Sequence, residues 1–366
     1  MSNDRPILFI HSSDEMYGSD RMLLEVIGSL SEEDRARALV WLPSDYGHGE
    51  NPLCTHLAAA GIAFDHVDMP VVRRRYLNPR GFLGLAGRAR RVRRSLAQVD
   101  PSEIFLVTSA VLPIAPLLGR RGKTRVLFYM QEIWAGNEGR GLALLARRVD
   151  RVIAVSEAAT ASMPEHLQRK TVIVPNGTPE PATVHPVAPK ESGLVFLMAG
   201  RWDYLKGHAM LVQAWDEADC PGRLVIVGSP SVLGTGVDVD ALVAASKRPE
   251  TIDVRGVVPD LGRVIDEVDV MLIPSILPES FGLVAIEAFA HGRPAVGSAI
   301  GGLPETIQDG AGWLVPPDDV AALADLLRTL TPADVMTAGA AARRRYEEQY
   351  SQAAFRPAMN AALTAA

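Results

Sequence analysis

The chain of 366 residues contains only two cysteines, Cys54 and Cys220, and no apolar run near the roughly 20 residues that span a bilayer. Two cysteines are too few for a disulfide framework or a thiolate metal cage, so we interpret them as isolated thiols in a reducing compartment. The N-terminus leads directly into a short apolar segment at residues 7–10, which is too short for a secretory signal peptide. We therefore expect a cytoplasmic protein.

Two nucleotide-binding motifs are also missing. No Gly-x-Gly-x-x-Gly follows the first apolar segment, and Lys206-Gly207 is not part of a Gly-x-x-x-x-Gly-Lys-Ser/Thr loop. These absences argue against a simple dehydrogenase and a P-loop nucleotidase. With 48% hydrophobic and 22% charged residues, the composition is that of a globular enzyme and excludes a disordered or collagen-like chain.

Charge is distributed unevenly. Residues 1–180 hold 23 Lys and Arg against 20 Asp and Glu, whereas residues 181–366 hold 14 Lys and Arg against 23 Asp and Glu.

Residues 73–94 contain no acid but nine arginines: Arg73, Arg74, Arg75, Arg80, Arg88, Arg90, Arg91, Arg93 and Arg94. This stretch predicts a helix over Arg80–Val99 with Leu83, Leu85 and Ala86 toward a sheet. Its arginines either contact anionic lipid or an acidic acceptor, or are solvated or paired with acids elsewhere. Nucleic acid is not expected, because no aromatic residues alternate with the arginines.

Short apolar segments alternate with amphipathic ones along the whole chain, a pattern typical of parallel sheets covered by helices on both faces. The expected strands are Ile7–Ile10, Ala38–Leu42, Ile62–Val67, Ile104–Val107, Val126–Tyr129, Val152–Val155, Val172–Val174, Leu194–Met198, Leu224–Val227, Ile252–Val254, Val270–Ile273 and Ala295–Gly297. A helix is expected at Arg21–Leu30.

The alternation of segments stops at Pro175–Ser192, which is rich in proline and is typical of an interdomain linker. We predict two doubly wound α/β domains: 1–176, then a linker at 177–192, then 193–345, with a helical segment at 346–366 that packs back on the first domain. Ligands are expected at the carboxyl ends of the strands, between the two domains.

The segment Leu277–Pro294 contains the most informative group of residues. Gly282 permits a close backbone approach to a ligand, and Ser280 is the expected N-cap of the helix that follows. Amides from Phe281 to Val284 would then face an anion such as phosphate. Glu279 and Glu287 are eight positions apart, so they would bracket an elongated ligand and accept hydrogen bonds from a sugar and a ribose. The alternative is one helix-capping acid and one exposed acid.

Two further loops follow expected strands. Gly200-Arg-Trp-Asp-Tyr-Leu-Lys-Gly207 carries Arg201 and Lys206, whose charges would neutralise a diphosphate and the charge that develops on it as a leaving group. Gly18 and Ser19 follow the first strand and open a helix whose amides would face the same diphosphate or the acceptor. For the cations, the alternative is that they are ordinary surface residues.

Together these segments resemble family 4 of the nucleotide-sugar glycosyltransferases, retaining enzymes of the GT-B fold with two facing Rossmann-like domains and a deep cleft between them. The family signature, Glu, seven residues, Glu, corresponds to Glu279 and Glu287, and the surrounding pattern matches Pro278 to Pro294. Further matches are Gly200 to Gly207, Val155-Ser-Glu157, Pro175-Asn-Gly177 and Gly301-Gly-Leu-Pro-Glu305. The resemblance spans nearly the whole chain.

The resemblance implies a role for each matched residue. Glu287 would hold the ribose and Glu279 the donor sugar. Arg201 and Lys206 would bind the diphosphate together with Ser280 and the amides of Phe281, Gly282, Leu283 and Val284. Gly18 would border the phosphates, and Arg255, Gly256 and Val257 would line the base pocket. Arg201, Lys206 and Glu279 are the expected catalytic residues. No metal and no cofactor is implied, because cations and a helix terminus would do the work of an ion.

One residue expected to contact the acceptor departs from the family pattern. Many members have a histidine where this chain has Gln131, and an amide can hydrogen-bond a sugar hydroxyl but cannot transfer a proton. With Tyr17 and Ser19, Gln131 is an expected acceptor contact.

The expected activity is retaining transfer of a hexosyl unit from a nucleotide-diphosphate sugar to a glycan, lipid-linked or small-molecule acceptor. We also expect a role in polysaccharide biosynthesis and contact with an anionic membrane surface. Two alternatives remain, a nucleotide-sugar epimerase of the GT-B fold and a non-catalytic nucleotide-sugar-binding protein.

Overall fold

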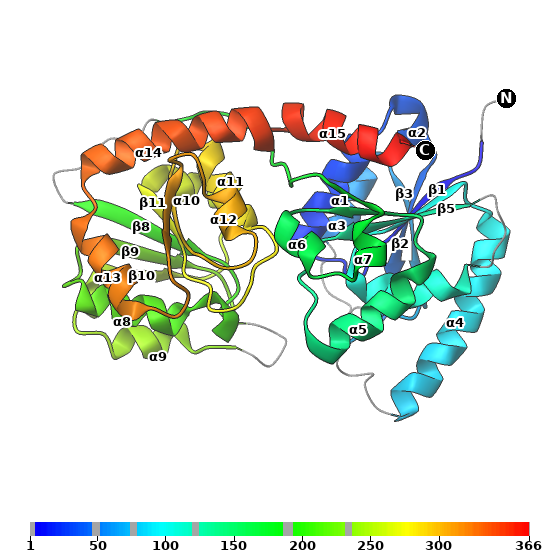
Figure 1. Ribbon diagram of the computed structural model, residues 1–366, viewed down its shortest axis with the longest axis horizontal. Helices are drawn as coiled ribbons and strands as arrows, with labels where there is room; N and C mark the ends of the chain where they lie inside the picture. The colour runs from blue at the N-terminus through cyan, green and yellow to red at the C-terminus, as the bar shows by residue number, and fades with distance from the viewer. Residues whose placement is uncertain are drawn as a thin grey trace. The chain divides into compact units, whose positions relative to one another are not determined.

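Every strand pairing among the described residues is parallel, in two separate sheets. The structure is a computed structural model that describes residues 4–45, 52–73, 79–118, 124–185, 193–230 and 236–365, with backbone only at 79–83, 85 and 86. The chain divides into two compact units, unit 1 (Met1–Asn176 with Phe355–Ala366) and unit 2 (Gly177–Ala354) (Figure 1). Of the expected linker, residues 186–192 lie outside the described residues.

Unit 1 contains a seven-stranded sheet in the order β3-β2-β1-β4-β5-β6-β7. Its strands are β1 (Ile7–Ile10), β2 (Ala38–Pro43), β3 (Ala63–Val67), β4 (Glu103–Leu106), β5 (Arg125–Met130), β6 (Arg151–Ala154) and β7 (Thr171–Ile173). The helices are α1 (Gly18–Gly28), α2 (Glu32–Ala36), α3 (Pro52–Ala59), α4 (Pro79–Val99), α5 (Gly136–Leu145), α6 (Glu157–Ala161), α7 (Glu165–Gln168) and the 3-10 turns η2 (Ser109–Leu117) and η3 (Ala146–Arg148). Strand order reverses between β1 and β4, so the loops after these two strands lie side by side at the carboxyl edge.

The end of the chain packs on unit 1. Helix α15 (Gln352–Thr364) buries Phe355, Met359 and Leu363, and it lies beside α1 in Figure 1. Polar contacts fix it in place: Arg125 donates to the Leu363 carbonyl (2.7 Å), and Asn360 donates to the carbonyl that follows α1, at Ser29 (2.9 Å). Its last turn is therefore satisfied by arginine rather than by a glycine cap.

Unit 2 contains a six-stranded sheet in the order β10-β9-β8-β11-β12-β13. Its strands are β8 (Leu194–Ala199), β9 (Gly222–Val227), β10 (Ile252–Arg255), β11 (Val270–Ile273), β12 (Ala295–Ser298) and β13 (Gly312–Val315). Its helices are η4 (Tyr204–Lys206), α8 (His208–Glu217), α9 (Val239–Ala244), η5 (Pro249–Thr251), α10 (Leu261–Glu267), α11 (Leu283–Ala290), α12 (Leu303–Thr306), α13 (Val320–Thr329), α14 (Pro332–Arg345) and the π-turn η6 (Tyr346–Tyr350). Helices α8, α9 and α13 cover one face, where Phe196 of β8 meets Trp215 edge-on at 5.5 Å.

The expected α/β fold is confirmed in both units, and the observed strands overlap all twelve expected ones. β13 is absent from the expected set. Its sequence, Gly-Trp-Leu-Val, is short and half exposed at the sheet edge, so it lacks the apolar run of a strand buried on both faces. Helix α1 begins at Gly18, where the helix was expected to open, and ends at Gly28, two residues before the end of the amphipathic pattern Arg21–Leu30.

Helix α4 is the arginine-rich segment, and part of its charge is neutralised inside unit 1. Arg88 pairs with Asp68 (2.8 Å) and Asp45 (3.3 Å), and Arg91 pairs with Asp68 (2.5 Å). Arg73, before the helix, also pairs with Asp45 (3.2 Å). The inward side chains that can be assigned are the buried Val92 and Leu96. The expected inward residues Leu83, Leu85 and Ala86, like Arg74, Arg75 and the Arg80 side chain, lie outside the described set.

Candidate functional site

Strand order in unit 2 reverses between β8 and β11, and this reversal brings two of the predicted loops together. The loop after β8 carries Gly200 to Gly207, and the loop after β11 carries Pro274 to Gly282. The Ile276 amide donates to the Leu205 carbonyl at 3.0 Å. Gly207 has a φ of 78°, and a Cβ there would lie 1.9 Å from the Pro274 carbonyl oxygen. Only glycine allows this backbone approach, so Gly207 sets the distance between the loops.

The two loops meet in an ion pair. The Lys206 ammonium lies 2.7 Å from Glu279 Oε1, and the Ser275 hydroxyl donates to the same oxygen. The Glu279 side chain is 15% exposed and that of Lys206 is 31% exposed. Burial pushes the pKa of Glu279 upward, but the charge of Lys206, hydrogen bonds from Lys206 and Ser275, and the charge of Arg201 outweigh it and hold the pKa below its usual range. Glu279 is therefore a charged hydrogen-bond acceptor with a cation beside it.

The second glutamate, Glu287, lies on the helix that follows this loop. It is half-buried and is the fifth residue of α11. The helix begins at Leu283, and its N-cap is Gly282 with a φ of 92°. The expected N-cap Ser280 is therefore wrong: the chain turns through the left-handed region at Gly282, two residues later. Amides in the first turn of α11, including those of Leu283 and Val284, have no carbonyl one turn earlier to bind, so they can bind an anion.

Two consecutive glycines hold the Glu279 loop from the other side. The Gly302 amide donates to the Glu279 carbonyl at 2.7 Å. A Cβ on Gly301 would lie 2.1 Å from the Glu279 carbonyl oxygen, and a Cβ on Gly302 would lie 2.3 Å from the Ser280 carbonyl oxygen. The Phe281 ring is buried against Tyr350, with centroids 5.7 Å apart. The carboxylate thus sits on a backbone fixed by packing, as a preorganised site requires.

Residues expected to line a base pocket lie at the end of β10, two strands from β8: Arg255 is its last residue, and Gly256 and Val257 follow it. Arg255 is paired with Asp253 (2.9 Å) and Glu267 (2.7 Å). The hydrogen bond to Glu267 raises its pKa, so its charge is already engaged within the protein. Gly256 and Val257 are exposed, Val257 to 75%. Gly256 and Val257 are therefore exposed to solvent, whereas Arg255 is held in two ion pairs.

The expected acceptor residues lie in unit 1, on the loops after β1 and β5. Tyr17 is 46% exposed and precedes Gly18 and Ser19 in the first turn of α1. The Gln131 amide donates to the Val107 carbonyl at the end of β4 (2.8 Å). This contact fixes the Gln131 side chain at the edge where the strand order of unit 1 reverses.

A buried polar cluster beneath these residues was not predicted from the sequence. His11 Nε2 lies 2.9 Å from Asp20 Oδ1, and the Ser13 hydroxyl donates to the same oxygen at 2.6 Å. Burial raises the pKa of Asp20, but the hydrogen bonds from His11 and Ser13 outweigh it and lower the pKa. The other Asp20 oxygen accepts from the Tyr17 amide at 3.1 Å. This cluster therefore ties the β1–α1 loop to the start of α1. The sequence signal that could have indicated this cluster is His11, a polar residue directly after the buried strand β1.

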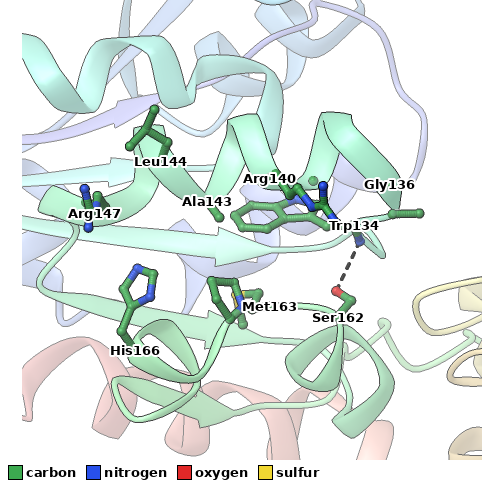
Figure 2. A pocket seen from close by; sticks show the side chains of 12 residues that line it. Trp134, Gly136, Arg140, Ala143, Leu144, Arg147, Ser162, Met163 and His166 are labelled. Carbon is green, nitrogen blue, oxygen red and sulfur yellow. Dashed lines mark hydrogen bonds between the residues drawn. The ribbon is translucent and has the colours of Figure 1, made fainter.

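Unit 1 also has a cavity of about 590 Å³ beside α5. Figure 2 shows Trp134 and Met163 with the cationic side chains Arg140 and Arg147 and the imidazole of His166 around it. The Trp134 amide donates to the Ser162 hydroxyl at 3.1 Å, which joins the loop after β5 to the segment after α6. This mixture of aromatic and cationic groups suits a ligand with an anionic end.

Comparisons with known proteins agree with the site in unit 2. Residues 193–331 match the family model described as Glycosyl transferases group 1, a range that contains both loops and α11. The similarity to this family therefore covers the part of unit 2 that holds these loops. The chain is 35% identical over 211 residues to a phosphatidyl-myo-inositol mannosyltransferase of Mycobacterium leprae, covering 53% of this chain and 54% of that protein. It is 36% identical over 170 residues to a D-inositol 3-phosphate glycosyltransferase of Mycobacterium marinum, covering 43% and 35%. The chain thus spans about half or less of the length of these relatives.

Solved structures show the GT-B fold over the whole chain. The Anabaena HepE structure in complex with UDP-glucose has a TM-score of 0.80 at 19% identity and covers 99% of this chain and all of that one. Sucrose-phosphate synthase from Thermosynechococcus elongatus has a TM-score of 0.78 at 21% identity, with 97% of each chain covered. Among the described residues, no helix is both long and apolar enough to cross a membrane.

A histidine next to the ion pair makes the stability of unit 2 sensitive to acid. His208 follows Gly207, is 1% exposed, and its burial lowers its pKa to about 4. In the unfolded chain its pKa is about 6.5, so between these values the unfolded state binds more protons and stability falls as pH falls. A tenfold change in proton affinity is about 1.4 kcal/mol, so the full loss near pH 4 is about 3 kcal/mol.

We expect His208→Leu to remove this part of the acid sensitivity. Denaturant unfolding followed from pH 7.5 to 4.5, a range of about three units around the ordinary histidine pKa, is the measurement. The variant should lose less stability than the wild type on acidification. His166→Leu, which removes an exposed histidine, is the control and should follow the wild type. Parallel curves for His208→Leu and wild type would contradict the assignment.

Proposed function

We propose that the chain is a retaining glycosyltransferase that moves a hexosyl unit from a nucleotide-diphosphate sugar to an acceptor hydroxyl. The observation that carries the proposal is the Lys206–Glu279 pair at the strand-order reversal of unit 2, beside the first turn of α11. A cation, a charged acceptor and free helix amides within one preorganised site suit a ligand that is anionic at one end and hydroxylated at the other. The family match over residues 193–331 supports this proposal.

Each side chain has a defined task in the proposed reaction. Lys206 and Arg201 bind the diphosphate, and the amides from Phe281 to Val284, next to Ser280, add donors. Glu279 accepts hydrogen bonds from the donor sugar, and Glu287 accepts them from the ribose. Gly18 and the turn Arg255–Val257 complete the donor contacts, whereas Tyr17, Ser19 and Gln131 contact the acceptor. No metal or other cofactor takes part in this scheme, because cations and helix amides stabilise the leaving group.

The proposed step retains the configuration at the anomeric carbon. The bond from that carbon to the diphosphate oxygen breaks, and the acceptor oxygen bonds to the same face. The departing phosphate oxygen takes the proton of the acceptor hydroxyl. Glu279 is not a covalent nucleophile in this scheme, since it holds ring hydroxyls away from the anomeric carbon.

The relatives and neighbours suggest which substrates to test first. HepE was solved with UDP-glucose, and the mycobacterial relatives are named for phosphatidyl-myo-inositol and inositol 3-phosphate. We therefore start with uridine donors and with inositol-containing, glycan and lipid-linked acceptors. The cationic residues around the cavity of unit 1 support an acceptor that carries phosphate.

Lys206→Ala and Arg201→Ala should lower kcat more than they raise KM for the donor. Their charges meet a leaving group whose negative charge grows in the transition state, and loss of one such group costs about 10²–10³ in rate. Steady-state kinetics with donor and acceptor is the measurement, and Arg263→Ala, a cation that is 86% exposed, is the control. If only KM for the donor rises, both residues bind the ground state and the assigned role is wrong.

Incubation of the wild type with donor alone distinguishes the two alternative functions. Formation of an epimer indicates an epimerase, and neither transfer nor hydrolysis indicates a non-catalytic binding protein.

We also propose that α4 contacts anionic membrane surfaces. Among the described side chains of α4, Arg88 and Arg91 are paired within unit 1, and the exposed cations Arg90, Arg93 and Arg94 support this proposal. Each exposed cation near an anionic surface contributes about 1 kcal/mol, so replacing all three by serine should weaken vesicle binding roughly 100-fold. Co-sedimentation with anionic and neutral vesicles across a salt series is the measurement. Serine at Arg223, Arg248 and Arg263 is the matched control. Equal binding to both vesicle types, or none, would contradict membrane contact.

A further inference from the structure

Three side chains with metal-binding donors meet in unit 1, and none of them has a role in the proposed transfer. Asp14 lies in the loop after β1, Cys54 on α3 and His66 on β3. The order β3-β2-β1 places these segments at one part of the sheet, and α3 connects β2 to β3. The residues are 40 and 12 positions apart in sequence, so only the fold brings them together.

The distances among the three donor atoms are close to those of a tetrahedral metal site. Cys54 Sγ lies 3.7 Å from His66 Nε2 and 3.0 Å from Asp14 Oδ2, and His66 Nε2 lies 2.8 Å from that same oxygen. With zinc–ligand bonds of about 2.3 Å to sulfur and 2.0 Å to nitrogen and oxygen, tetrahedral angles require about 3.5 Å between sulfur and either atom, and about 3.3 Å between nitrogen and oxygen. Side-chain shifts of about 0.5 Å would therefore accommodate the ion.

Burial also suits a bound ion. The Asp14 side chain is fully buried, whereas that of His66 is 36% exposed, so the cluster is closed beneath and open toward solvent. One sulfur, one imidazole and one carboxylate form a ligand set that favours zinc over magnesium or calcium, which prefer oxygen alone. We propose that Asp14, Cys54 and His66 bind one zinc ion, with water as the fourth ligand.

Binding would rearrange the protons of the cluster. Without metal, Asp14 accepts from the Cys54 amide, the Cys54 thiol and His66 Nε2. Zinc would take the place of the thiol proton, which is released to solvent, and the remaining imidazole proton would sit on Nδ1.

A bound ion would add a bond to each of three segments that hydrogen bonds among Asp14, Cys54 and His66 already join. It would tie the β1–α1 loop to α3 and to β3, and that loop leads to Tyr17 and Gly18 at the start of α1. Because metal binds the folded arrangement and not the unfolded one, zinc should raise the thermal stability of unit 1. The transfer reaction proposed for unit 2 does not use this ion.

Titration of the metal-free full chain with zinc chloride tests the site. We expect one zinc per chain, a higher Tm on addition of zinc, and, with cobalt(II) as a probe, the near-ultraviolet charge-transfer band of a cobalt–thiolate bond. Cys54→Ser should abolish this band and weaken zinc binding at least about 10–100-fold, the loss already seen when only an outer-shell partner of a zinc site is removed. Asp14→Asn should weaken binding as well.

The second cysteine provides the matched control. Cys220→Ser, in unit 2, should leave the stoichiometry, the cobalt band and the zinc-induced change in Tm unchanged. Circular dichroism and a cooperative thermal transition of metal-free Cys54→Ser verify that the variant is folded. The proposal is overturned if wild type binds no zinc at metal concentrations well above that of the protein. It is also overturned if folded Cys54→Ser binds zinc as tightly as wild type.

Discussion

Close backbone contact at glycine positions determines the geometry of unit 2. Gly207 lets the loop after β8 touch the Pro274 carbonyl, and Gly301 and Gly302 let the loop before α12 touch Glu279 and Ser280. Any Cβ at these positions would collide with a carbonyl oxygen, so the spacing cannot be reproduced with other residues. The Lys206–Glu279 ion pair, the turn at Gly282 and the first amides of α11 all depend on this spacing. Because the charges are held by backbone packing, little reorganisation is needed when a charged ligand arrives.

The two units differ in how their polar groups are held. In unit 2 a cation and a carboxylate face each other across a strand-order reversal, and the matched family model lies within this unit. In unit 1 the corresponding reversal, between β1 and β4, is occupied by the buried His11–Asp20–Ser13 cluster and by Gln131. The family match covers residues 193–331 of unit 2, whereas the proposed acceptor contacts Tyr17, Ser19 and Gln131 lie in unit 1.

Local patterns in the sequence predicted the strands and the loops that follow them, because each depends on neighbouring residues. The order of the strands was not predicted, so the switch point in unit 2 that brings Lys206 and Glu279 together comes from the structure. Features that depend on long-range packing were missed. Gly282 replaces Ser280 as the cap of α11, and the Asp14–Cys54–His66 cluster joins distant segments. The pairing of Arg88 with Asp45 and Asp68 is one of the alternatives that the sequence left open. Two cysteines excluded a thiolate cage, but not a site with one thiolate.

Calorimetric titration with UDP, GDP, ADP and TDP tests the central claim, that the first turn of α11 and its flanking carboxylates bind a nucleoside diphosphate. The account predicts that one of these nucleotides binds wild type at one site per chain. Glu287→Ala should weaken that binding by about 1.5–3 kcal/mol, the range for a hydrogen bond to a charged group. Glu348→Ala, an exposed acid in the same unit, should bind like wild type. Absence of binding by all four nucleotides, or equal affinity for wild type and folded Glu287→Ala, would contradict the account.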